Sequence, residues 1–519
     1  MVVEIENGLS VAQNADLPQY QIPTREGRFQ MKKSSAKQRI GQLKLDLLDQ
    51  KEISVSFDGE DLSNSGGTLL LAQIEKLNGL IRGCAQRLDD HRTGSLVKHS
   101  QFDLVMQRVM QIVAGFPTGS DSTLLRNDPA IKIATGRDPL TGEELASQAS
   151  QSRLETQRNF KELYRLCQWL VDYYIQCHPK PPKNLVLDFD GSAIETYGLQ
   201  LQAFYRSGPY GKFMYFPLFV FDQDGWLLVA ALRPGDHGEV KLALPVLKRL
   251  VARLRKAWPA VKITIRADGA FTDAGFYKWM DDNNVCFVLG IKHNNTLLTH
   301  SLQARRAALK KFKRKFGATK FTASDGKYDK FEELKDIRTT TDAEERRRKS
   351  KTFYSRVVRV FGDFQYKAKS WDRERRIICR CDCDDEGLNV RYVVTNIQNF
   401  TAAQIYEDLY CKRARIELCI KNMKETQCHR LSCSQFKSNM FRLILHSLAY
   451  TLVHQARIAL PKALKNMSFS SFCRRFVNVA VQIRESKKSV MVRISASYVD
   501  AHKFRLLAKR HGATSLIAA

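Results

Sequence analysis

The sequence lacks any uninterrupted apolar stretch of membrane-spanning length. A helix needs about 20 consecutive apolar residues to cross a bilayer, and the best run, 443–460, contains His446, His454, Gln455 and Arg457. The first residues, MVVEIENGLSVAQ, have neither the basic start nor the apolar centre of a signal peptide. We therefore expect a protein with no membrane span and no export signal.

Acidic residues are scarce relative to basic ones. The 519 residues include 83 Lys and Arg but 54 Asp and Glu, which gives a formal charge of +29 and an isoelectric point near 9.7. Hydrophobic residues at 44% and charged residues at 26% are ordinary for a folded protein and exclude global disorder. So large a positive charge indicates a polyanionic partner, and nucleic acid is the first candidate. A basic surface that serves only solubility is the alternative.

The twelve cysteines do not suggest a disulfide framework, because a protein without an export signal keeps its thiols reduced. Cys379, Cys381 and Cys383 alternate, so on a strand they would share one face and could not by themselves wrap a tetrahedral ion. Cys428 and Cys433 also depart from the usual zinc spacing. We expect core positions for both groups, with zinc binding as the minor alternative.

The apolar pattern divides the chain into six regions. Residues 66–88, 102–115 and 152–176 show helical periodicity. From residue 184 the pattern becomes βββαβαβ, typical of a mixed sheet flanked by helices. Strong helices are predicted again over 403–425 and 441–460. The expected regions are a flexible arm (1–50), a helical region (51–180), a first part of the mixed-sheet core (184–292), a β-rich insertion (293–395), a second part of the core (396–460), and a basic, mostly helical C-terminal region (461–519).

Three acidic residues stand out by position. Asp190 lies in the first core strand, Asp268 ends a later strand, and Glu417 lies in a helix of otherwise basic and apolar residues. Asp188 faces the same side of its strand as Asp190 and is an alternative to it. Carboxylates at strand ends, joined by one from a helix, can hold two Mg²⁺ ions about 3.5–4 Å apart for phosphodiester cleavage. Taken singly, each acid would more often be a capping or ion-paired residue.

One face of the helix over 403–425 is rich in charge. Tyr410, Arg413, Glu417 and Lys424 fall within a sector of about 60° at about 100° per residue, with Lys421 close by. The cations could grip phosphates beside a metal-bound carboxylate. The plainer interpretation is a solvated face with an Arg–Glu pair four residues apart.

The spacing Y-x2-R-x3-E-x6-K in this helix resembles the signature of a branch of DDE transposases from bacterial insertion sequences. Further segments resemble one group of that branch, insertion-sequence family 1380: DLVMQRVMQIVAG, LLRNDPAIK, LASQASQSRLE, LDFDGSAIETYG, LRPGDHG, IRADGAF, SWDRERR, VVTN and NMFRLILHSLAY. The resemblance covers roughly residues 55–500. Leu418 and Cys419 depart from it, because the family usually has a more polar residue after the glutamate.

The resemblance implies an α/β fold with an RNase H-like catalytic core, a β-rich insertion, an all-helical N-terminal DNA-binding region over 51–180 and a helical C-terminal region. It implies that Asp190, Asp268 and Glu417 form the catalytic triad and bind two Mg²⁺ ions, for which Mn²⁺ can substitute. Asp190 is preferred to Asp188 because it begins Asp-Gly-Ser, like the family's Asp-x-Ser.

The resemblance also implies a set of DNA contacts. Tyr410, Arg413 and Lys424 are expected to contact phosphates near the transposon end, and Trp371 to stack on an unpaired base. From the charge pattern itself we expect further phosphate contacts at Lys421 and, in the basic run 345–351, at Arg346, Arg347 and Arg348. For Trp371 a core position is the alternative.

The implied activity is that of a bacterial transposase, cytoplasmic and associated with the nucleoid. It would bind the terminal inverted repeats of its own element, cleave double-stranded DNA and join it to target DNA by cut-and-paste, as a homodimer on paired ends. Two other interpretations remain open: a catalytically silent domesticated transposase or DNA-binding regulator, and another RNase H-like nuclease such as a junction resolvase.

Overall fold

A computed structural model describes residues 43–45, 53–56, 61–207, 210–238, 240–316, 337–354, 356–384 and 387–514. The chain divides into two compact units, 1–60 and 61–519. In the first unit, β1 (Leu43–Leu45) pairs with β2 (Ile53–Val55) in antiparallel fashion. Apart from residues 43–45, the expected arm over 1–50 lies outside the described residues.

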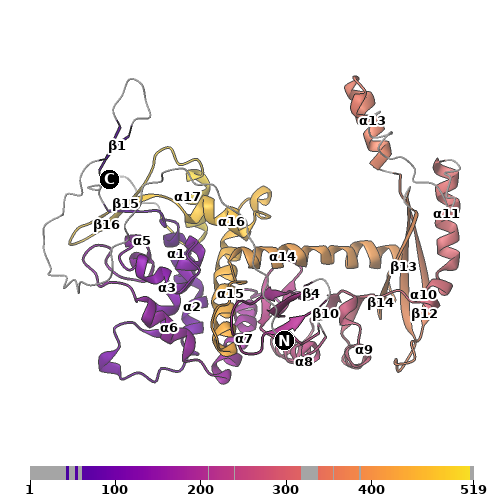
Figure 1. Cartoon of the computed structure of the whole chain (residues 1–519), viewed down its shortest axis with the longest axis horizontal. Coiled ribbons are helices and arrows are strands. Elements are labelled where there is room, and N and C mark those ends of the chain that lie inside the picture. Colours follow the sequence, from indigo (N-terminus) through magenta and orange to yellow (C-terminus); the bar gives the residue numbers. More distant parts are fainter. Residues whose placement is uncertain are drawn as a thin grey trace, which may run out of the picture. The chain divides into compact units, whose positions relative to one another are not determined.

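An eight-stranded mixed sheet organises the second unit, in the order β12-β13-β14-β11-β10-β4-β8-β9 (Figure 1). Three central strands are parallel neighbours: β4 (Asn184–Gly191), β10 (Lys262–Ala267) and β11 (Cys286–Ile291). On one side of them, β8 (Leu218–Asp222) and β9 (Leu227–Ala231) continue the sheet as antiparallel strands. The predicted mixed α/β architecture with a large mixed sheet is confirmed.

Crossover helices connect the parallel strands. α8 (Ala243–Ala257) precedes β10, and α9 (Ala274–Asp282) leads from β10 to β11. Leu247, Leu250 and Leu254 recur at spacings of three and four residues on α8, and all three are buried in the main core. Because parallel strands need such connections, the carboxyl ends of β4, β10 and β11 meet at one edge of the sheet.

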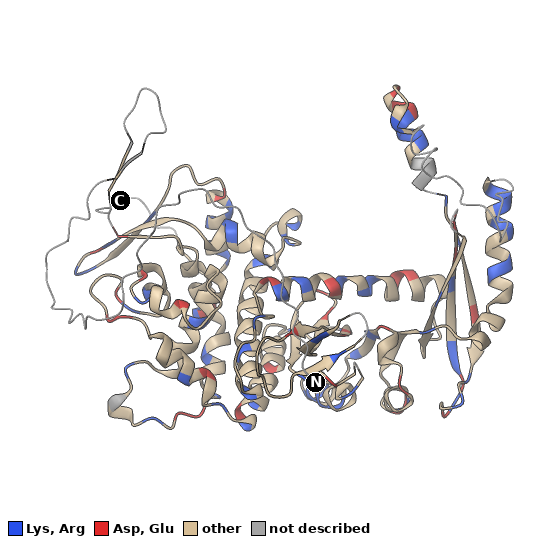
Figure 2. Cartoon of the chain, in the orientation of Figure 1, with Lys and Arg blue, Asp and Glu red and all other residues tan. Residues whose placement is uncertain are grey.

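The region expected to be a β-rich insertion contains both helices and strands. β12 (Val358–Tyr366), β13 (Arg375–Asp384) and β14 (Gly387–Thr395) form an antiparallel meander. β14 pairs with β11, so the meander extends the central sheet. The helices are α10 (Asn295–His300), α11 (Leu302–Phe316) and α13 (Ala343–Tyr354). The basic runs 305–316 and 345–351 of the sequence therefore lie in α11 and α13, where Figure 2 shows Lys and Arg gathered.

Residues 66–178 form helices, but two of the predicted long helices are each broken in two. The helix expected over 66–88 divides at Gly79, whose φ of 70° is a left-handed conformation that ends a helix. The helix expected over 152–176 divides before Asn159, which begins a new helix through a capping box with Glu162. The helices are α1 (Thr68–Asn78), α2 (Leu80–Ala85), η1 (Gly94–Leu96), α3 (Gln101–Ala114), α4 (Asp121–Leu124), α5 (Pro129–Ala134), α6 (Gln148–Thr156) and α7 (Phe160–Gln176).

The long helix α15 (Phe436–Ile458) joins these helices to the sheet. It contacts α1, α3, α6 and α7 as well as β9, and most of its residues are buried. Before it, η3 (Gln404–Tyr410), η4 (Cys411–Arg413) and α14 (Ala414–Glu425) follow one another without a loop. The helical region and the sheet thus share one hydrophobic core.

The C-terminal region also returns to the N-terminal helices. It contains η5 (Lys462–Leu464), α16 (Phe469–Phe472), η6 (Cys473–Val477), β15 (Val481–Glu485), β16 (Val490–Ile494) and α17 (Ala501–Arg510). β15 pairs with β16 and with β3 (Leu62–Ser63), which lies about 420 residues earlier in the chain. Gly66 and Gly67 donate backbone hydrogen bonds to the carbonyls of Val479 and Val477.

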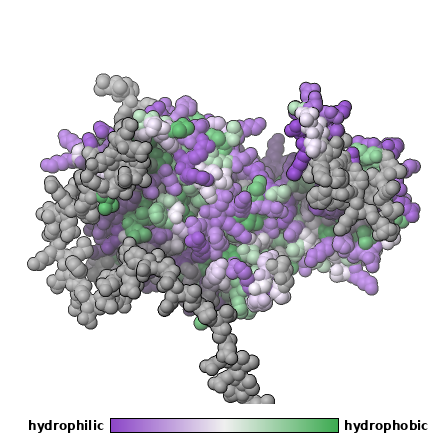
Figure 3. Space-filling model, turned by 45° about the horizontal axis from the view of Figure 1, so that its top comes forward, coloured by the Kyte–Doolittle hydropathy of each residue, from purple (hydrophilic) through white to green (hydrophobic). Residues whose placement is uncertain are grey.

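Within the described part of the chain, no helix combines the length and apolar character that crossing a bilayer requires. On the face drawn in Figure 3, hydrophilic side chains predominate and hydrophobic ones form scattered groups.

A small exposed sheet was not foreseen. β7 (Lys212–Tyr215) pairs with β5 (Ile194–Glu195) and β6 (Phe204–Arg206). Several large hydrophobic side chains around it are exposed, including Tyr197, Tyr205 and Phe213. Met214 and Tyr215 of β7 are buried, but buried and exposed residues do not alternate in these strands, so the usual sequence signal for a strand is absent.

Candidate active site

The structure brings the three predicted acids together. Asp190 lies near the end of β4, and Asp268 directly follows β10, the parallel neighbour of β4. Both carboxylates therefore lie at the edge of the sheet where these strands end. Glu417 reaches the same place from the first turn of α14.

One arginine contacts all three carboxylates. The Nη2 atom of Arg413 lies 3.0 Å from Oδ2 of Asp190 and 3.7 Å from Oδ2 of Asp268, and its Nη1 lies 3.9 Å from Oε1 of Glu417. The exposed fraction of the side chain rises from 15% at Asp190 to 40% at Asp268 and 71% at Glu417. The cluster is thus anchored inside the protein at Asp190 and opens to solvent at Glu417.

The electrostatics of the cluster show a deficit of positive charge. Burial is the largest influence on Asp190 and raises the pKa of its carboxyl from 3.8 to about 6. Arg413 lowers this pKa, whereas Asp268 and Glu417 raise it again. Since one guanidinium faces three carboxylates, a further cation would stabilise the ionised form of Asp190.

Asp188 has a different role, although it lies only two residues before Asp190. Its oxygens accept two hydrogen bonds from Arg266, at 2.6 and 2.7 Å, and both side chains are almost fully buried. Arg266 also donates to the backbone carbonyl of Leu409 at 2.8 Å. The pair thereby holds the chain just before Tyr410 in place. Both oxygens of Asp188 are bonded to Arg266 and buried, so Asp188 supports the site from behind.

The helix that carries the signature is irregular, in contrast to the regular helix that the sequence predicts. Residues 404–410 have π-helical hydrogen bonding and 411–413 form a 3₁₀ turn, so regular α-helix begins only at Ala414. The switch changes the angular position of each side chain along the axis. A uniform 100° per residue therefore does not describe the face that holds both Tyr410 and Glu417.

The side chain of Tyr410 packs closely against Gly290 on β11. A Cβ atom at Gly290 would lie 2.6 Å from the Tyr410 hydroxyl and 2.9 Å from the backbone nitrogen of Gly269. Only glycine permits this close approach. Burial raises the pKa of Tyr410, so its phenol stays protonated and can donate a hydrogen bond.

The other predicted DNA contacts lie in different surroundings. Lys421 is exposed and Lys424 half-buried on α14, and neither forms an ion pair with another described residue. Arg346, Arg347 and Arg348 are exposed on α13.

Trp371, by contrast, is 5% exposed. Its ring packs against Tyr277 and Tyr366, at centroid distances of 5.4 and 5.5 Å. Because other aromatic side chains cover the ring and little of it reaches solvent, the structure favours the core interpretation of Trp371 over base stacking.

The expected cysteine groups also lie inside the protein. Cys379, Cys381 and Cys383 share the buried face of β13 and belong to the main core, as does Cys428. Cys433 is half-buried.

Sequence reasoning missed two parts of the site. The first is Arg266, the buried partner of Asp188. The second is the position of Arg413 between the acids, where a phosphate contact had been expected. A signal for the first was present, because Arg266 stands two residues before Asp268, among the apolar and small residues at the end of a short strand.

The donor set suits a divalent cation. Three carboxylates supply the oxygen ligands that Mg²⁺ and Mn²⁺ prefer. Among the described residues, no group of three or more His, Cys, Asp or Glu side chains is arranged to hold a metal ion as it stands. In the triad the guanidinium of Arg413 makes the contacts that such a cation would make, so the residues fit the group in their chemistry.

Comparison with known proteins gives the family. Residues 45–513 match the family described as Transposase DDE domain group 1. The chain belongs to this family of DDE transposases. No curated protein matches the sequence. Among solved structures, the chain is similar to the piggyBac transposase in a cryo-EM structure of its synaptic complex with hairpin DNA. The identity is 10% and the TM-score 0.36, over 88% of this chain and 85% of that one.

The residues that match the DDE transposase family include all eight strands of the central sheet and the helices that precede and follow them in the chain. Asp190, Asp268, Arg413 and Glu417 all lie within the matched residues. The expectation of a transposase is therefore confirmed at the level of the family.

Proposed function

We propose that this transposase binds the terminal inverted repeats of an insertion sequence of the family 1380 type, cleaves the DNA there in a metal-dependent reaction and transfers the strands to target DNA by cut-and-paste. Asp190, Asp268 and Glu417 are the catalytic and metal-binding residues, in a core of RNase H-like type. The observation that carries the proposal is the meeting of these three carboxylates around one arginine at the edge of the central sheet.

The surroundings of the acids prepare them for this role. Oδ1 of Asp268 accepts a hydrogen bond from the backbone N–H of Ala270 at 3.0 Å, which fixes the carboxylate and leaves Oδ2 directed to the cluster. Two Mg²⁺ ions, when bound, supply activation of the attacking oxygen and stabilisation of the leaving oxygen. Arg413 holds the carboxylates near one another without the ions, and it limits their mutual repulsion.

The basic elements supply affinity for DNA. Tyr410, Lys421 and Lys424 lie on the segment that carries Glu417, where they would contact phosphates next to the reacting bond. The cations of α11 and of Arg346, Arg347 and Arg348 on α13 add contacts that do not depend on base sequence. Because both ends of the element must be held at once, the active form on double-stranded DNA is at least a homodimer. It acts in the bacterial cytoplasm, at the nucleoid.

A cleavage assay tests the proposal. Labelled linear DNA carrying the sequences that flank the gene is incubated with the protein and Mg²⁺, with Mn²⁺, and with EDTA. Metal-dependent cuts at a fixed boundary are expected, and Asp268→Asn should abolish them. Glu407→Gln is the control. Glu407 is an exposed acid in the helical segment that leads to Glu417, and it pairs with Arg359 outside the cluster.

Three results would contradict the proposal. Cleavage by Asp268→Asn at the wild-type rate would remove Asp268 from the catalytic site. Tight, specific binding of the ends without any cut, in every metal tested, would favour a silent or regulatory protein. Cutting of four-way junctions without preference for element ends would favour a resolvase-like nuclease.

A further inference from the structure

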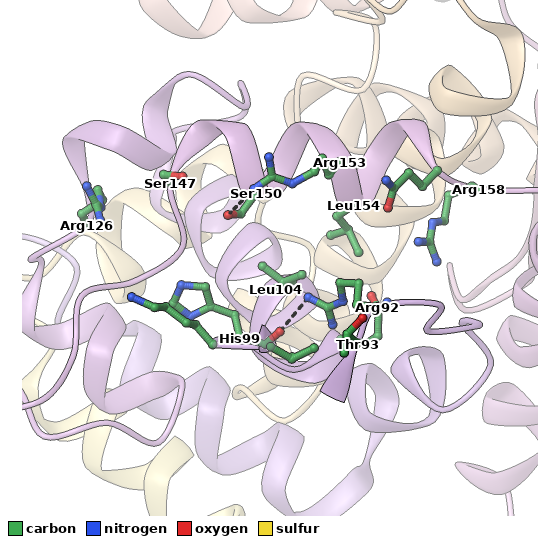
Figure 4. Close-up of a pocket in the computed structure, with 14 residues that line it drawn as sticks. Arg92, Thr93, His99, Leu104, Arg126, Ser147, Ser150, Arg153, Leu154 and Arg158 are labelled. Carbon is green, nitrogen blue, oxygen red and sulfur yellow. Dashed lines mark hydrogen bonds between the residues drawn. The ribbon is translucent and has the colours of Figure 1, made fainter. Parts of the chain in front are cut away.

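A pocket of about 450 Å³ lies in the N-terminal helical region. It is bounded by residues 92–99, the start of α3, the loop before α5, and α6 with the two residues that follow it (Figure 4). Its volume is in the range of small-ligand sites. The pocket shares no residue with the acidic cluster.

The lining of this pocket is positively charged. Five side chains are cationic (Arg92, Lys98, Arg126, Arg153 and Arg158), and none of the fourteen lining residues is Asp or Glu. Three of the arginines pair with carboxylates that are not part of the lining, namely Asp90, Glu144 and Glu162. Lys98 and Arg153 form no ion pair with any described residue. The pocket therefore presents positive charge that the protein itself does not neutralise.

The start of α6 adds hydrogen-bond donors to the pocket. Ser147 is the N-cap residue of this helix, yet its side chain makes no capping hydrogen bond. In the same region, α3 and α7 both begin with a complete capping box. Ser147 and Ser150 both line the pocket. An uncapped helix start with two hydroxyl groups beside it favours an anion.

A buried arginine at the pocket has an unused donor. Arg158 is 4% exposed, and its Nη1 donates to Glu162 at 2.7 Å. Its Nε atom is buried without a hydrogen-bond partner. Buried donors are normally paired, so this N–H is available to an acceptor that enters the pocket.

Apolar side chains complete the wall. Val97, Leu104 and Leu154 line the pocket beside the cations. A group with an anionic part and a flat, less polar part suits such a mixed wall. The phosphate, sugar and base of one nucleotide have these properties.

We propose that this pocket binds a nucleotide unit of a DNA strand, with the phosphate on the cations and on the start of α6. The inference rests on the proposed function only in that the partner is DNA. It assigns to the helical region a contact site that is separate from the site of cleavage.

The test compares the salt dependence of DNA binding in two matched double variants. Lys98→Ser with Arg153→Ser removes the two pocket cations that have no ion pair. Lys76→Ser with Lys180→Ser removes two exposed lysines elsewhere in the helical region. The dissociation constant is measured by fluorescence anisotropy on duplex DNA in EDTA, so that no cleavage is needed, between about 50 and 200 mM salt.

Each phosphate contact contributes about one unit to the slope of log K against log salt concentration. The pocket takes one phosphate, so the pocket variant should lose about one unit of slope. The control variant should keep the wild-type slope, and both should keep the wild-type melting temperature. A pocket variant with the slope of the control would overturn the proposal.

A charge reversal and a free nucleotide complete the experiment. Ser150→Glu, which leaves every cation in place, should weaken DNA binding in the same way. ATP binding is measured by calorimetry on the same proteins. If the pocket variant loses ATP binding but keeps its slope for DNA, the pocket serves a free nucleotide and the proposal is wrong. If the wild type cleaves DNA and the pocket variant binds it unchanged, the pocket assignment fails while the proposed function stands.

Discussion

Two arginines contact aspartates of strand β4, and the two contacts differ in how much negative charge remains uncompensated. In the inner contact, Arg266 and Asp188 form a closed pair with two hydrogen bonds, buried from solvent. In the outer contact, Arg413 is shared among Asp190, Asp268 and Glu417. A closed pair is a structural element, whereas one cation among three carboxylates leaves negative charge that a ligand can neutralise. The ratio of positive to negative groups, more than the residue type, separates the supporting Asp188 from the three acids that we propose to be catalytic.

The largest effect is expected at the open end of the outer cluster. Glu417→Gln should reduce DNA cleavage below detection, because it removes one of the three proposed metal ligands while keeping the shape of the side chain. Its free energy of unfolding should change by less than about 0.5 kcal/mol, as for other exposed side chains. Cleavage assays and urea unfolding measure the two quantities. Retained cleavage would show that the outer cluster is not the reactive one.

The inner pair should respond in the opposite way. Asp188→Asn leaves Arg266 buried without its charge partner, which should cost about 3–5 kcal/mol of stability. The loss is measured by urea unfolding at pH 7, with Asp190→Asn as the control on the same strand. If Asp188→Asn were as stable as the wild type, the distinction between a closed and an open contact would fail.

A smaller effect, of opposite sign, is expected at Asp190. Burial gives its carboxyl a folded pKa of about 6, above its ordinary 3.8, so ionisation of Asp190 opposes folding. Stability should therefore fall as the pH rises through this window. Asp190→Asn should be more stable than the wild type by about 1–3 kcal/mol at pH 7 without metal. The difference should vanish below pH 3.8; a difference that does not depend on pH would contradict the assignment.

The smallest effect concerns Arg413. Because Arg413 lowers the pKa of Asp190, Arg413→Gln should move the pH window of the previous prediction to higher pH. Arg413→Lys keeps the charge and should leave the window nearer to that of the wild type. Unfolding free energies measured across pH without metal give both positions. An unchanged window in Arg413→Gln would show that the guanidinium does not act on Asp190.

The sequence allowed the prediction of features that depend on local patterns. Strand-end acids at Asp190 and Asp268 were predicted because each lies at the end of a short strand with alternating apolar residues, and neighbouring strands joined through a helix are parallel. Gly115 ends α3 as predicted, since a glycine after an apolar helix readily adopts the left-handed conformation.

Other features depend on tertiary contacts and could not be predicted from local patterns. The break at Gly79 lies within an unbroken helical periodicity, because α2 continues to bury apolar residues against the same core. The place of Arg413 among the acids depends on the change from π-helical to 3₁₀ to α-helical hydrogen bonding, which has no clear sequence signature. That β14 joins the central sheet is a long-range pairing. The strands of the β5–β7–β6 sheet show no regular alternation of buried and exposed residues.

Because β3 pairs with β15, the N-terminal helical region can be completed only after the C-terminal part of the chain has been synthesised. β3 leaves the ribosome early, but its partner strand follows only about 420 residues later. The helices α1, α3, α6 and α7 also pack on α15, which is made late. Such non-local contacts cannot form during most of translation. We therefore expect a prematurely terminated product to lack a stable helical region, so that it does not compete with the full chain for DNA.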